Sequence, residues 1–185
     1  MMLKPIWFFA IILTMTGNVS EEYEPLKKEA AGILAKQAET AEEGFVRLDA
    51  ALALLPYRPS KAIPVAIEEL ESGKINYVFE KKAVDSLAHF LSRDVIRKVR
   101  RILRKSPQAR WAVRLISQVG DPDDLRLTEP YFLDPASDPA LIPLLAVYEK
   151  NAQGILSELL HYSALKSCIA AELLMDMGIT DYHDV

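Results

Sequence analysis

Two apolar patterns separated by a short break lie between Val46 and Leu70. The first pattern is Arg47-Leu48-Asp49-Ala50-Ala51-Leu52-Ala53-Leu54, the break is Arg58-Pro59-Ser60, and the second pattern is Ala62-Ile63-Pro64-Val65-Ala66-Ile67-Glu68-Glu69-Leu70. Ala and Leu favour helix, whereas Pro cannot continue a helix interior. The stretch therefore predicts one helix, a tight break, and a second helix that opens at Ile63-Pro64.

Parts of this order recur further along the chain. The partial copies are Arg110 to Asp123 with its Gly120-Asp121-Pro122 turn, Asp138-Pro139 followed by Leu141-Ile142-Pro143, and Ala170-Ala171-Glu172 leading to Gly178. Breaks near Arg58, Ser92, Gly120, Asn151 and Gly178 lie roughly 30 residues apart, a little below the period of common helical repeats. Between Asp134 and Pro139 two breaks crowd together, so the third copy is irregular.

With its basic residue, Ala-rich helix, break and Ile-Pro in that order, the first copy resembles the short HEAT-like repeat of α-solenoids. The resemblance extends over residues 45–185 and implies an all-α domain of stacked antiparallel helix hairpins. Such domains present a surface to a partner, which implies a protein without enzymatic activity or cofactor. A compact helical bundle is the alternative, because its helices also end in Gly and Pro.

The N-terminus has the pattern of an export signal. Lys4 precedes an apolar run, Pro5 to Leu13, which gives way to small and polar residues and then to the acidic pair Glu21-Glu22. A basic start, an apolar core of about 7–15 residues and a small-residue exit are typical of a secretory signal peptide. We therefore expect residues 1–20 to be a signal peptide, or an anchor if uncleaved, and the protein to be periplasmic or secreted.

Residues 21–44 read as a charged amphipathic helix with Pro25 in its first turn, where Pro is tolerated. Its apolar stripe contains Leu26, Ala30, Ile33, Leu34 and Ala38. Solenoids need terminal units with a polar outer face, so this segment is expected to cap the first repeat.

The formal charge of −4 conceals a strong asymmetry along the chain. Nine basic residues and one acid, Asp94, lie between Arg93 and Arg114, whereas residues 120–185 carry twelve acids and three bases. In the helix expected from Val95 to Lys105, the apolar residues Val95, Val99 and Ile102 share one face, with Ile96 and Leu103 beside them. The candidate binding residues on and near its exposed side are Arg97, Lys98, Arg100, Arg101, Arg104, Lys105, Arg110 and Arg114.

Two interpretations of this basic block stay open: a recognition surface, or a set of ion pairs with the acidic C-terminal half. Guanidinium groups bind carboxylates and phosphates with a planar fork of donors, so a recognition surface suits an acidic protein partner or anionic lipid headgroups. The acidic remainder of the chain and the export signal argue against nucleic acid. In the next helix, Val119 is expected inside and Ser117 outside.

Metal chemistry is the runner-up, a small metal-binding helical bundle. Glu158-Leu159-Leu160-His161 matches the Glu-x-x-His pair with which helical bundles bind metal ions, but the second pair and the extra glutamates are missing. Asp121, Asp123 and Asp124 are interpreted as a turn and a helix N-cap. The lone Cys168 lies in an apolar run and is expected to be buried.

Overall fold

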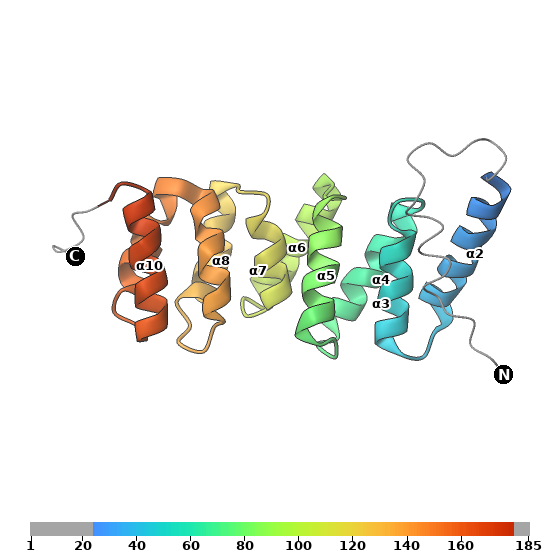
Figure 1. Cartoon of the computed structure of the whole chain (residues 1–185), viewed down its shortest axis with the longest axis horizontal. Helices are drawn as coiled ribbons and strands as arrows, with labels where there is room; N and C mark the ends of the chain where they lie inside the picture. The colour runs from blue at the N-terminus through green and yellow to red at the C-terminus, as the bar shows by residue number, and fades with distance from the viewer. Residues whose placement is uncertain (1–23, 180–185) are drawn as a thin grey trace. The chain divides into compact units, whose positions relative to one another are not determined.

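The computed structural model describes residues 24–179, and every regular element in this part of the chain is a helix (Figure 1). The all-α prediction is thus confirmed for these residues. The contacts divide the chain after Phe90 into two units, of which the described parts are 24–90 (unit 1) and 91–179 (unit 2). The predicted signal peptide, 1–20, lies outside the described residues.

Unit 1 consists of the helices α2 (Glu24–Thr40), α3 (Gly44–Leu54), α4 (Pro59–Glu71) and α5 (Tyr77–Ala88). Each helix packs against the next, and α2 also meets α4 while α3 also meets α5. Small and branched apolar residues such as Ala51, Ala62 and Ile67 fill the interior. Because Ala allows helices to approach closely, the short helices of this unit bury nearly continuous apolar faces.

The second helix of the segment from Val46 to Leu70 begins earlier than the sequence predicted. The helix α4 starts at Pro59, so Ile63-Pro64 lies inside it and does not open it. The first helical position suits Pro, because the missing N–H would have no intrahelical acceptor there. Pro59 therefore decides the boundary.

Of the expected capping segment, residues 24–40 are helical as α2, which packs on α3, and Gly44 already belongs to α3. Its buried row contains Ala30, Leu34 and Ala38 as predicted, together with Ala31 and Ala35. Leu26 and Ile33, which the sequence placed in the stripe, are exposed. The contact face is therefore made mostly of alanines, which leaves the larger side chains beside it in solvent.

Unit 2 contains α6 (Arg93–Lys105), α7 (Arg110–Ser117), α8 (Pro122–Phe132), the 3₁₀ helix η2 (Pro139–Ala152), α9 (Gln153–Leu159) and α10 (Ala164–Asp176). The helix α7 lies against α6, α8 and η2, and η2 in turn contacts α9 and α10. Trp111, Phe132 and Tyr148 are buried. Glu149 interrupts η2 with a positive φ of 49°, a conformation rare outside glycine.

The faces of α7 differ from the prediction at two residues. Ser117, expected outside, is buried, and the hydroxyl of Tyr148 on η2 donates a hydrogen bond to its Oγ at 3.5 Å. Val119, expected inside, is exposed beyond the end of the helix. The side of α7 that carries Ser117 is covered by the 3₁₀ helix η2. The apolar pattern of α7 alone does not predict this contact.

The expected burial of Cys168 is wrong, because this thiol is exposed. The helix α10 turns Lys166, Ala170 and Leu174 inward, three residues spaced by four. Cys168 lies about 200° around the helix from Lys166, so it faces outward. No helix in residues 24–179 combines the length and the apolar character that crossing a bilayer requires.

Candidate binding surface

The helix α6 holds most of the predicted binding residues, and its ends are well defined. The Ser92 side chain caps it by accepting a hydrogen bond from the N–H of Val95 at 3.3 Å. Asp94 lies in the first turn, and Arg104 and Lys105 lie in the last, where each charge has the favourable sign for the helix dipole. These caps fix the register with which the helix presents its side chains.

The buried face of α6 consists of Val95, Val99 and Leu103. The most solvent-exposed face is opposite, and we call its cations the basic row. The basic row is made of Arg93, Arg97, Arg101, Arg104 and Lys105, all exposed.

Four of these cations, Arg93, Arg97, Arg101 and Lys105, follow one another at intervals of four residues. This spacing places them along one side of the helix over about 18 Å. Arg97 lies 3.5 Å from Asp94, and both side chains are largely exposed, so this contact is weak. The other members of the basic row make no ion pair with another described residue.

Arg100 lies on α6 but does not belong to this surface. Its guanidinium donates two hydrogen bonds to Asp124, from Nε at 2.6 Å and from Nη2 at 2.9 Å, and a third from Nη2 to Asp121 at 2.6 Å. Hydrogen bonding to Asp124 raises the pKa of Arg100 above its ordinary value. Both carboxylates belong to the start of α8, so Arg100 ties α6 to α8.

Arg110 and Arg114, the two candidates on α7, are also only partly accessible. The Arg110 guanidinium lies 3.8 Å from the Asp138 carboxylate, before η2, and Arg114 is about half-buried. Lys98 on α6 is half-buried as well. The two interpretations of the basic block therefore apply to different residues: Arg100 and Arg110 pair with acids of the C-terminal half, and the basic row faces solvent.

Asp121 has two structural roles at the start of α8. Its side chain accepts a hydrogen bond from the N–H of Asp123 at 3.0 Å, which confirms the predicted N-cap, and it also binds Arg100. The hydrogen bond from Asp123, followed by that from Arg100, lowers the pKa of Asp121 below its ordinary range. The sequence predicted the N-cap, but it did not predict the hydrogen bond from Arg100 to Asp121.

Unit 1 contains an arginine that links helices in a similar way, and the sequence did not predict this role. Arg47 on α3 lies 2.8 Å from the buried carboxylate of Glu69 and 3.4 Å from Glu68, both on α4, and its Nε donates to the carbonyl of Ala38 at 3.3 Å. The basic residue that opens the first repeat pattern thus links α2, α3 and α4. The position of Arg47 at the start of the repeat pattern was the one feature of the sequence that could have indicated this structural role.

The candidate metal ligands do not form part of a larger cluster. Glu158 is exposed near the end of α9, and His161 is exposed just beyond it. Within residues 24–179, no three His, Cys, Asp or Glu side chains gather closely enough to hold an ion. An exposed pair of this kind makes at most a weak site.

Comparison of the chain with protein-family models, with curated proteins and with solved structures found no match.

Proposed function

We propose that this protein is an exported, non-enzymatic helical-repeat protein that binds the acidic surface of another protein through the basic row of α6. The observation that carries the proposal is the line of cations at intervals of four residues on the exposed face. Like charges at this spacing destabilise a helix by roughly 0.2–0.5 kcal/mol per pair. Three consecutive pairs of this kind oppose folding, so their presence favours a role in binding.

The repeat architecture belongs to the same proposal. In unit 1 each helix contacts the next and the next but one, as stacked hairpins do. In unit 2 the same holds for α6, α7 and α8, while the 3₁₀ helix η2 departs from the regular pattern. Export is proposed from Lys4 and the apolar run to Leu13, and sequencing the N-terminus of protein from the native host tests it.

The binding proposal is tested by reversing Arg97, Arg101 and Arg104 to Glu. The matched control reverses three exposed lysines elsewhere, Lys28, Lys36 and Lys150, and so changes the net charge equally. Both variants and the wild-type chain are used to capture partners from the exported fraction of the native host, and their melting temperatures are measured. We expect only the α6 variant to lose capture, with little change in melting, because exposed charges contribute little to stability.

Salt and lipid controls complete this experiment. Capture should weaken as salt rises, because exposed charges are screened over about 8 Å at physiological ionic strength. If the α6 variant captures the same proteins as the wild type, the basic row is not the binding surface. If wild-type protein instead binds vesicles of anionic lipid and loses them in the α6 variant, the partner is a membrane and the protein-binding proposal is wrong.

A further inference from the structure

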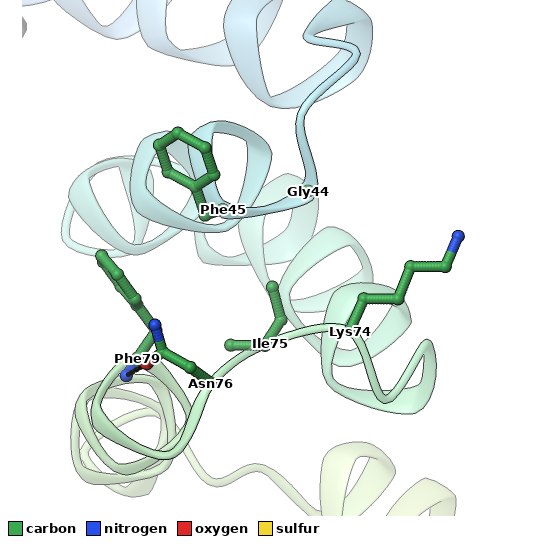
Figure 2. Close-up of a pocket in the computed structure, with 6 residues that line it drawn as sticks. All are labelled: Gly44, Phe45, Lys74, Ile75, Asn76 and Phe79. Carbon is green, nitrogen blue, oxygen red and sulfur yellow. Dashed lines mark hydrogen bonds between the residues drawn. The ribbon is translucent and has the colours of Figure 1, made fainter.

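Unit 1 contains a pocket of about 370 Å³ between the starts of α3 and α5 (Figure 2). It is lined by Gly44, Phe45, Lys74, Ile75, Asn76 and Phe79. None of these residues belongs to the basic row, and all of them lie on the other unit. The pocket is therefore a separate candidate site.

Exposed apolar side chains gather around this pocket. The rings of Phe45 and Phe79 approach to 6.3 Å between their centroids at an angle of 40°, and Phe45 is 49% exposed. Beside Phe79, Tyr77 is also exposed and Val78 is 73% exposed. Single exposed apolar residues are ordinary, whereas a group that includes two neighbouring aromatic rings marks an interaction surface.

Phe45 lies in the first turn of α3 and Phe79 in the first turn of α5, and the start of each helix is fixed by local contacts. The Asn76 side chain caps α5 by accepting hydrogen bonds from the N–H groups of Val78 and Phe79, each at 3.1 Å. At the start of α3, a Cβ on Gly44 would lie 2.5 Å from Oε2 of Glu69, so glycine lets this buried carboxylate sit against the helix start. The backbone that carries Phe45 and Phe79 is thus ordered before any ligand arrives, which lowers the entropic cost of binding.

Apart from Lys81 and Lys82, which pair with Asp85 and Asp49, the charges that adjoin the lining residues in sequence are mainly acidic. Glu42 and Glu43 are exposed and directly precede Gly44, and Glu71 is exposed at the end of α4. The one lining cation, Lys74, extends away from the two rings in Figure 2. An apolar floor beside carboxylates is complementary to a ligand that combines an apolar side chain with neighbouring positive charges.

We propose that this pocket docks a basic amphipathic segment of a protein partner. A large apolar side chain of that segment enters beside Phe45, Ile75 and Phe79, and its flanking Lys or Arg residues face Glu42 and Glu43. Helical segments bind apolar grooves in this way through a few anchor residues. The site differs from the basic row in position and in the sign of its charge, so the two surfaces select different partners and either can fail without the other.

The test uses the full chain and a synthetic helical peptide with leucines on one face and lysines on the other. We expect saturable binding that Phe45→Gln weakens about tenfold or more, since aromatic anchors dominate such interfaces. The matched control is Leu165→Gln on α10, because Leu165 is a comparably exposed apolar side chain, 59% exposed, outside the pocket. This control should bind like the wild type, and circular dichroism checks that all variants fold.

A second variant tests the charges without touching the rings. Changing Glu42 and Glu43 together to Gln should weaken binding of the leucine–lysine peptide and flatten its dependence on salt. A leucine–glutamate peptide should bind the wild-type chain more weakly than the lysine peptide does.

Several results would overturn the proposal. They are equal binding by wild type and Phe45→Gln, tighter binding of the leucine–glutamate peptide, and no saturable binding of the lysine peptide by the wild-type chain. Sedimentation supplies one more. If wild-type protein self-associates and Phe45→Gln alone makes it monomeric, the pocket is filled by a second copy of this chain and not by a basic partner.

Discussion

The guanidinium of Arg100 holds the carboxylate of Asp124 with two hydrogen bonds, and this carboxylate is only 1% exposed. Forked pairing of this kind is the strongest geometry that arginine and a carboxylate can adopt. A buried carboxylate that loses its partner costs far more than an exposed one. The helix α6 therefore uses Arg100 to stabilise the fold, whereas the next residue, Arg101, faces solvent.

Replacing Arg100 by Met should lower the free energy of unfolding by about 3 kcal/mol, because Asp124 would remain buried without its cation. The matched control is Arg101→Met on the same helix, which should change stability by less than about 0.5 kcal/mol. Urea unfolding of both variants measures the difference. Equal stabilities would show that the pair contributes nothing to folding.

Acid should destabilise the fold through Asp121. Its pKa is lowered in the folded protein, first by the N–H of Asp123 and then by Arg100, from an ordinary value of 3.8. A carboxyl of this kind stabilises the folded state above its unfolded pKa, and this contribution is lost as pH falls through the folded pKa. The melting temperature should therefore decrease as the pH is lowered from about 4. In Asp121→Asn the fall should be shallower, and an unchanged pH profile would contradict this role.

The all-α class and the positions of most breaks could be predicted from the sequence because they depend on local chemistry. Gly120 supplies a positive φ of 70°, and Asp121 caps α8 as expected. The burial of Val95 and Val99 followed from helical periodicity in the same way. Each of these predictions needs only a few neighbouring residues.

The ion pairs could not be predicted, because they join residues more than twenty positions apart. Arg47 with Glu69 and Arg100 with Asp124 depend on which helices pack together. Helical periodicity places Arg101 opposite the buried face of α6 and Arg100 at the edge of that face, but it does not show that Asp124 lies beside Arg100. The burial of Lys166 was not predicted for a related reason. Its acceptors, the carbonyl of Asp134 and the hydroxyl of Ser137, lie in a loop about thirty residues earlier in the chain.

Trp111 should be a major contributor to the stability of unit 2. Its side chain is buried in the interior of this unit, only 5% exposed. Trp111→Ala removes a large aromatic side chain from the interior and should cost about 3–5 kcal/mol. Phe45→Ala, which removes a half-exposed ring in unit 1, should cost clearly less. Chemical denaturation compares the two, and a cost below about 1 kcal/mol for Trp111→Ala would place its ring at the surface.

Lys166 should anchor the loop between α8 and η2. Its side chain is 1% exposed, and Nζ donates to the carbonyl of Asp134 at 2.5 Å and to Oγ of Ser137 at 2.8 Å. Lys166→Met keeps the apolar stem but leaves both acceptors unsatisfied, and should cost about 1–3 kcal/mol. The control Lys150→Met removes an exposed lysine of the same unit and should be nearly neutral. Hydrogen exchange of the amides of residues 134–138 should accelerate only in the Lys166 variant. Unchanged exchange would show that the loop is ordered without the hydrogen bonds from Lys166.

Replacing Gly120 should destabilise the fold for two separable reasons. Its φ of +70° suits glycine, and a Cβ there would lie 2.7 Å from Cγ1 of Val147 on η2. The left-handed conformation costs other residues about 1 kcal/mol, and the branched Val147 side chain cannot rotate freely to relieve the contact. We therefore expect Gly120→Ala to lower the free energy of unfolding by about 2–3 kcal/mol.

Combining Gly120→Ala with Val147→Ala separates the two costs. The double variant removes the steric contact but keeps the positive φ, so it should regain part of the stability and remain about 1 kcal/mol below Val147→Ala alone. Val147 is half-exposed, so its own truncation should cost little. The four proteins form a double-mutant cycle that urea unfolding can measure. A cycle with no coupling would mean that η2 does not press against the Gly120 turn, and full recovery would mean that the turn tolerates alanine at its φ.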